Sequence, residues 1–357
     1  MLPVKRTISR LVFLLPLLAV VPIIFTAELR AATPTTSGTF RVETQWNVGG
    51  KGGWGFLGLD EATHKLYIPR TNRVMVVDTE TGKISGQVGG MTNVRNIALD
   101  DSGRYGYVTD ATDGTAGFVR VFDRSSLKLV ASVPTGLIPY AIVFEATTKS
   151  VIVFNSHSHS ATVIDSATNQ ITATIPLSSR PGSAVADGKG SVFVTLPALG
   201  QIVRIDAATR KVTTSWLLAP CTGPAGLAIN SAGRQLFTVC EDHKIVAVNM
   251  DTGHVAAIGD APPNSGDINF DSRHNMLFVA DASGTLTIFR HEPSDKYSMF
   301  QKVKTQIGAR TMVVSQQDAK AYLVTSKFGQ NTSAISEELQ FRPTPIPDTF
   351  AVIVVGR

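Results

Sequence analysis

The chain has 357 residues, of which 43% are hydrophobic and 17% are charged, and its formal net charge is +5 at pH 7. This apolar content is enough for a substantial core, and length alone suggests two domains. Residues 1–32 hold four basic residues and one acidic residue, so without them the net charge is only +2. The basic balance of the whole chain therefore gives no argument for nucleic-acid binding.

The first 32 residues have the outline of a secretory signal peptide. Three basic residues precede the apolar stretch 11–25, and small residues follow at Ala31 and Ala32. The apolar stretch is short for a membrane span and contains two prolines. We therefore expect a periplasmic or secreted protein with no stable membrane span after cleavage, and an uncleaved anchor is the alternative. Residues 33–39 are predicted to be a polar linker.

A repeated unit of four short strands accounts for residues 40–357. Its clearest copy is 97–133, where apolar and β-branched stretches alternate with turns rich in Gly, Asp and Ser. Its first strand ends in Asp100, and the same position recurs at steps of 40 to 45 residues. The seven aligned positions are Asp60, Asp100, Glu145, Asp187, Asn230, Asp271 and Ser315. Seven four-stranded units at this period predict an all-β, seven-bladed β-propeller with antiparallel blades.

Two further positions repeat with the same period. The second strands align at Tyr67, Tyr107, Ile152, Phe193, Phe237, Phe278 and Tyr322, and the third strands end at Asp78, Asp123, Asp165, Asp206, Asn249 and Arg290. Unit seven has no sequence left for a fourth strand after 349–355, whereas the strand at 40–48 has no unit of its own. We expect the N-terminal strand to complete blade seven and to close the ring.

The two cysteines lie at the same end of the predicted blade five. Cys221 precedes its first strand and Cys240 ends its second strand. Cys221 reaches Cys240 only if residues 222–224 fold back, and an exported protein meets an oxidising compartment. A disulfide is expected, and two reduced thiols are the alternative.

The stretches GYVTD at Gly106, VFVTL at Val192 and LFVAD at Leu277, with strands ending in VVD at Asp78 and VID at Asp165, resemble the YVTN β-propeller repeat. The exported chain as a whole is similar to the YncE-like proteins over residues 40–357. The resemblance implies an exported propeller and, from one relative, DNA binding, although no motif for that role carries over.

Residues at the starts of the first strands are expected to converge on one mouth of the central channel. Those proposed to bind a ligand are Trp54, Arg95, Asn96, Tyr140, Asp267 and Arg310, and Ser183 and Ala225 occupy the corresponding positions of blades four and five. This mixture suits a small polar or anionic ligand or a partner protein. Alternatively, Asp267 simply pairs with Arg310 or Arg95 in a narrow tunnel.

The longest irregular segment, 327–348, is expected to emerge at the same mouth, with Phe341 to Pro347 packed over it. His157 and His159 point the same way on an extended chain, but two ligands are too few for a metal site, so a solvated loop is preferred.

Signatures of catalysis, cofactor binding and haem attachment are missing from the sequence. We therefore expect no enzyme, no cofactor and no metal, and a non-catalytic binding scaffold that works through the channel mouth. Two alternatives belong to other classes. One is a propeller that binds single-stranded nucleic acid through aromatic and basic residues. The other is a lactonase-like enzyme, for which only Asp267 supplies an acid at the mouth.

Overall fold

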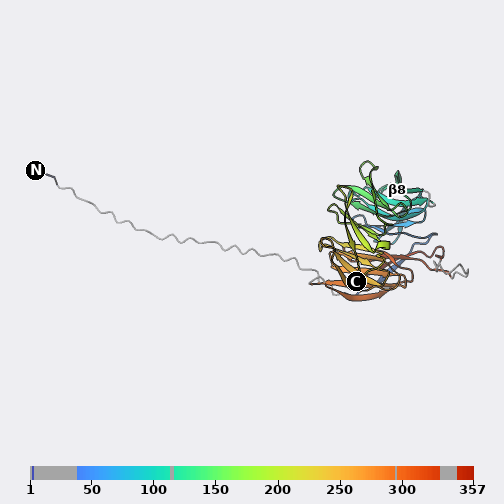
Figure 1. Cartoon of the computed structure of the whole chain (residues 1–357). Coiled ribbons are helices and arrows are strands. Elements are labelled where there is room, and N and C mark those ends of the chain that lie inside the picture. Colours follow the sequence, from blue (N-terminus) through green and yellow to red (C-terminus); the bar gives the residue numbers. More distant parts are fainter. Residues whose placement is uncertain (1, 4–37, 113–115, 294–295, 330–343) are drawn as a thin grey trace. The chain divides into compact units, whose positions relative to one another are not determined.

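The computed structural model describes residues 2–3, 38–112, 116–293, 296–329 and 344–357. Most of the predicted signal peptide and linker, and much of the long loop of blade 7, lie outside these ranges. The described residues form seven four-stranded antiparallel sheets, which confirms the predicted seven-bladed propeller. Figure 1 shows these small sheets coloured in chain order. Among the described residues, no helix is long and apolar enough to cross a membrane.

Each of the first three blades is a meander of consecutive strands. Blade 1 contains β2 (Gly58–Asp60), β3 (Lys65–Arg70), β4 (Arg73–Asp78) and β5 (Ile84–Val88). Blade 2 contains β6 (Val94–Leu99), β7 (Tyr105–Thr112), β8 (Ala116–Asp123) and β9 (Lys128–Thr135). Blade 3 contains β10 (Pro139–Glu145), β11 (Ser150–Asn155), β12 (Ser160–Asp165) and β13 (Gln170–Pro176).

The next three blades follow the same order. Blade 4 contains β14 (Ala184–Ala186), β15 (Ser191–Leu196), the 3-10 helix η1 (Pro197–Leu199), β16 (Gln201–Asp206) and β17 (Lys211–Leu217). Blade 5 contains β18 (Leu227–Asn230), β19 (Gln235–Val239), β20 (Lys244–Asn249) and β21 (Val255–Asp260). Blade 6 contains β22 (Ser265–Asp271), β23 (Met276–Asp281), β24 (Thr285–Glu292) and β25 (Lys296–Lys304).

Blade 7 closes the ring in the predicted way. Its own strands are β26 (Thr311–Val314), β27 (Ala321–Thr325) and β28 (Ala351–Gly356), and its outermost strand is β1 (Arg41–Asn47). The antiparallel register pairs Arg41 with Gly356 and Asn47 with Ala351. Both chain ends of the ring are therefore held in one sheet.

The core lies between the blades. The described residues form seven clusters of buried hydrophobic side chains, one at each blade junction, and the aligned second-strand position contributes one large residue to each cluster. Those residues are Tyr67, Tyr107, Ile152, Phe193, Phe237, Phe278 and Tyr322. A single blade leaves these side chains exposed, so stacking around the ring supplies the burial that stabilises each sheet.

The repeated acids are turn caps. At the ends of the third strands, one side-chain oxygen accepts a hydrogen bond from the backbone N–H three residues later, at 2.7–2.9 Å. The acceptors are Asp78, Asp123, Asp165, Asp206 and Asn249. Asx turns of this kind satisfy backbone donors that the ladder leaves unpaired.

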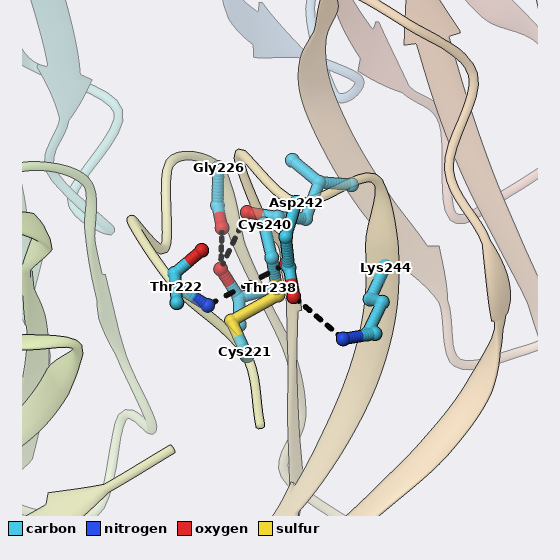
Figure 2. Close-up of a disulfide and its surroundings, with 8 residues drawn as sticks. Cys221, Thr222, Gly226, Thr238, Cys240, Asp242 and Lys244 are labelled. Atoms are coloured by element: carbon cyan, nitrogen blue, oxygen red, sulfur yellow. Dashed lines mark hydrogen bonds and ion pairs between the residues drawn. A yellow bond between two sulfur atoms is a disulfide. The ribbon is translucent and has the colours of Figure 1, made fainter. Parts of the chain in front are cut away.

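The expected disulfide is present. Cys221 and Cys240 are bonded, with their Cα atoms 5.6 Å apart (Figure 2). The fold-back of residues 222–224 is achieved at Gly223, whose φ of 56° suits glycine, and the Glu241 N–H donates to the Thr222 carbonyl at 2.9 Å. The bond fastens the loop that enters blade 5 to the end of its second strand.

Candidate functional site

The central channel is lined by residues from all seven blades and encloses a cavity of about 250 Å³. The lining is mostly apolar, with polar groups from Asn96, Ser183, Asp267 and Asn269. It is made by Phe56, Leu57, Asn96, Ile142, Ser183, Ala184, Val185, Leu227, Ala228, Ile229, Asp267, Ile268, Asn269, Phe270, Met312 and Val313. An apolar wall with a few convergent polar groups is typical of small-ligand sites.

Tyr140 lies near the charged residues predicted for the channel mouth. It is half-buried, and its ring packs edge-on against Phe56, with centroids 5.8 Å apart. Burial raises the pKa of Tyr140, and the nearby carboxylate of Asp267 adds to that rise. Three guanidinium groups oppose the rise, those of Arg310, Arg95 and Arg180. The mouth therefore gathers three cations and one acid around a phenol.

Asp267 is held by neutral donors. Its Oδ1 accepts from the Ile268 N–H at 3.0 Å and from Asn269 Nδ2 at 3.3 Å, and its Oδ2 accepts from the Met312 N–H at 3.2 Å. Among the described residues, no ion pair within 4.0 Å joins Asp267 to Arg310 or Arg95, and both arginines are exposed. The direct pairing of Asp267 with one of these arginines, which the sequence left as an alternative, is therefore not observed. Burial raises the pKa of Asp267 to about 7, because the enclosed site disfavours a charged carboxylate.

The structure brings most of the predicted mouth residues together. Arg95, Asp267 and Arg310 are each within electrostatic range of Tyr140, and Asn96 lines the channel. Trp54 instead packs against Phe350 and Phe328 at the junction of blades 7 and 1, with ring centroids 5.2 and 6.2 Å apart. The aromatic residue that faces the channel from blade 1 is Phe56, two residues further on.

Arg180 and Phe56 were missed by the sequence argument. Arg180 lies in the loop between β13 and β14, three residues before the aligned position Ser183. The repeat alignment considers one residue per blade, whereas a loop approaching the channel presents several. A search for cations within three residues of the aligned position identifies Arg180.

The loop that carries Trp54 wraps around a buried arginine. The Arg70 guanidinium donates to the backbone carbonyls of residues 49–53 at distances of 3.0–3.3 Å. Its side chain is fully buried and lies 3.6 Å from the ring centroid of Phe350. Burial lowers the pKa of Arg70 to about 10, so the guanidinium remains charged at neutral pH. An internal cation therefore organises a Gly-rich loop beside the mouth.

The base of the long loop of blade 7 lies beside Trp54. The Ile346 N–H donates to the Lys327 carbonyl at 2.8 Å, and Phe328 forms a bridge with Pro345. The expectation that Phe341 to Pro347 covers the mouth falls partly outside the described residues, because 330–343 are not described.

The opposite opening has the reverse charge. A cavity of about 500 Å³ there is lined by Asp60, Glu61, Asp100 and Asp101. Arg124 lines it too and is an internal partner, because its Nη2 pairs with Asp60 and its Nη1 lies 3.6 Å from Asp100. Val313 borders both cavities, so the channel has one basic and one acidic end. No group of three or more metal-ligating side chains occurs in the described part of the chain.

Comparisons with known proteins show the fold alone. No protein-family model and no curated protein matches this chain. Among solved structures, hydrazine synthase from Kuenenia stuttgartiensis superposes with a TM-score of 0.66 at 16% identity, over 75% of this chain and 91% of that one. U3-55K and the WD40 repeats of RRP9 each superpose with a TM-score of 0.70 at 10% identity, over 88% and 89% of this chain and 98% of theirs. The chain thus shares the fold of a seven-bladed β-propeller with these structures.

Proposed function

We propose that this protein is a non-catalytic binding propeller whose basic channel mouth holds a small anionic ligand or an acidic group of a partner protein. The observation that carries the proposal is the set of three arginines, Arg95, Arg180 and Arg310, around Tyr140 at the opening of an apolar channel. Guanidinium groups bind carboxylates and phosphates through paired hydrogen bonds. None of the three donates to a described carboxylate.

We further propose that the protein is exported and belongs to the YVTN, YncE-like propellers. Support comes from the signal-like N-terminal sequence, from the disulfide, and from the repeat motifs in the second and third strands. Disulfides persist mainly in oxidising compartments such as the periplasm. A propeller is a rigid frame that presents loops at its channel mouth, which suits a binding role.

A direct test uses a panel of small carboxylates and phosphate esters in isothermal titration calorimetry at low and moderate salt. We expect at least one anion to bind, with affinity reduced about tenfold in Arg310→Gln and in Arg95→Gln. Arg41→Gln is the matched control, because Arg41 is an exposed arginine in β1 at the outer edge of blade 7. If no anion binds, or if all three variants lose affinity equally, the mouth is not the site.

The two alternatives from the sequence predict other ligands and another activity. Single-stranded nucleic acid is expected to bind with an affinity that falls steeply with salt, because phosphate contacts release counterions. A lactonase-like enzyme is expected to hydrolyse a lactone in a metal-dependent way. The three arginines surround one opening, which favours a compact anion over an extended strand.

A further inference from the structure

One position at the end of the second strand of each blade lies beside the loop that enters that blade from the preceding one. It is the third residue after the aligned second-strand position, and it is buried in every blade: Arg70, Asp110, Asn155, Leu196, Cys240, Asp281 and Thr325. We call it the tether position. Four of its occupants fasten the preceding inter-blade loop: Arg70 through carbonyls, Cys240 through the disulfide, Thr325 by donating to the Ile307 carbonyl, and Asp110 through N–H groups.

Blade 2 shows what a carboxylate requires at the tether position. Asp110 Oδ1 accepts from the N–H groups of Thr92 and Asn93 at 3.1 and 2.7 Å. Its Oδ2 accepts from Arg120 Nε at 2.9 Å, and Arg120 Nη1 donates to Ser132. The carboxylate is fully buried but completely satisfied, which is what a buried charge needs.

Blade 6 keeps the acid but lacks the arginine and one of the two backbone donors. In the strand register, Val108 faces Arg120 in blade 2 and Val279 faces Thr287 in blade 6, so Thr287 stands where blade 2 has its arginine. The inter-blade loop aligns in the same way, because Val94 faces Asp110 and Ser265 faces Asp281. Pro263 therefore replaces Thr92, and proline has no N–H to donate.

The result is a buried carboxylate with one unused oxygen. Asp281 is fully buried, and its Oδ1 accepts from the Ser283 N–H at 2.7 Å. Its Oδ2 and the Thr287 hydroxyl have no hydrogen-bond partner among the described residues. Both residues line a cavity of about 610 Å³ between blades 5 and 6. Blade 3 has a neutral amide at this position: Asn155 Nδ2 donates to Ser160 and Thr162 at 3.2 and 3.0 Å, and its Oδ1 also has no partner among the described residues, so blade 6 differs in that its unpaired oxygen belongs to a carboxyl group.

The cavity has the charge and lining for a cation with an aliphatic stem. Its carboxylates are Asp281 and Asp260, against one ammonium group, that of Lys302. Lys302 faces Thr287 from the next strand but is exposed and does not hydrogen-bond Asp281 Oδ2. Apolar wall is supplied by Phe289 and Met299.

We propose that this cavity binds the guanidinium group of a ligand, in the place that Arg120 occupies within blade 2. One N–H of the group donates to Asp281 Oδ2 and another to the Thr287 hydroxyl, while the stem lies on the apolar wall. The group belongs either to a free small molecule or to an arginine side chain of a partner protein. The site lies outside the channel and takes a cation, so it is independent of the anion site proposed above.

The first experiment measures binding of agmatine to the purified protein by calorimetry and thermal shift, with putrescine as the probe that carries an ammonium in place of the guanidinium. We expect agmatine to bind and putrescine to bind about tenfold more weakly. In Asp281→Asn, agmatine affinity falls about tenfold or more, whereas Glu80→Gln, a change at an exposed acid, leaves it unchanged. Equal binding of the two probes, or full binding to Asp281→Asn, overturns the proposal.

The second experiment introduces the arginine of blade 2 at the corresponding position of blade 6. Thr287→Arg is expected to raise the melting temperature and abolish agmatine binding, because the new side chain fills the site. If that variant fails to fold, Thr287→Val must still weaken agmatine binding severalfold. Lys302→Gln is expected to strengthen binding without loss of stability. A clear fall in the melting temperature of Lys302→Gln would identify Lys302 as the internal partner of Asp281 and reject the site.

A third comparison separates the two sources of the guanidinium. The tripeptide Gly-Arg-Gly is tested against agmatine, with Gly-Lys-Gly as its control. Tighter binding of the arginine tripeptide indicates an arginine of a partner protein, and tighter binding of agmatine indicates a small molecule. Failure of both to bind contradicts the proposal and leaves the anion site at the mouth untouched.

Discussion

The Arg70 guanidinium stacks on the ring of Phe350 across the junction where the propeller closes, with its central carbon 3.6 Å from the ring centroid. Arg70 belongs to β3 of blade 1, and Phe350 immediately precedes β28 of blade 7. The same guanidinium gathers the carbonyls of residues 49–53. One side chain therefore joins the first blade, the last blade and the loop between β1 and β2.

Replacing Arg70 is expected to destabilise the closed ring. Arg70→Leu removes five hydrogen bonds from a charged donor, and we expect a loss of about 2–4 kcal/mol in the free energy of unfolding by urea denaturation. Arg70→Lys keeps the charge but lacks the planar guanidinium group, so its free energy of unfolding should lie between those of the wild type and Arg70→Leu. If Arg70→Leu unfolds at the wild-type urea concentration, the loop does not depend on this cation.

Asp267 gives a specific pH dependence of stability. Its folded pKa of about 7 is above its ordinary value of 3.8, so between these values the folded state binds more protons than the unfolded state. This contribution to stability is full below about pH 4 and is lost as pH rises to about 7, on the order of 1–2 kcal/mol because part of the side chain is open to the channel. Asp267→Asn should lack this slope in denaturation at pH 5 and pH 8. An unchanged slope in the variant argues against a raised pKa.

The disulfide is expected to stabilise the protein without being needed for its fold. Cys221 and Cys240 are 19 residues apart, and a bond across such a loop contributes about 3 kcal/mol in the chain-entropy model. The Cys221→Ser, Cys240→Ser double variant should lose about this much and become insensitive to reductant. A wild-type protein whose urea midpoint does not move on reduction contradicts this expectation.

Arg124 forms a buried charge cluster between blades 1 and 2. It pairs with Asp60, and its Nη1 donates to the Asp100 carbonyl at 3.1 Å. Arg124→Leu leaves two buried acids without their partner, and we expect a cost of about 3–5 kcal/mol in urea denaturation. Arg41→Leu, at an exposed arginine, is the control and should change stability little.

The architecture follows from short-range patterns. The acids at Asp78 and Asp123 recur because each caps its own turn, and Tyr67 and Phe278 recur because each blade must bury one large side chain at its junction. Strand alternation and turn chemistry act over a few residues, so a single sequence displays them directly. The pairing of β1 with β28 could be predicted in the same way, because the sequence shows one strand without a unit at its start and one unit without a fourth strand at its end.

The sites depended on contacts that no local pattern records. The tether position carries Arg70, Asp110, Cys240 and Asp281, which look unrelated in the sequence although they occupy one place in the blade. Phe56 rather than Trp54 faces the channel, because the loop before β2 is shaped by the Arg70 cation and by Phe350. Which side chain enters a channel, and which buried acid lacks a partner, is set by neighbouring blades. Such packing is decided only when the ring closes, because residues far apart in the chain then meet.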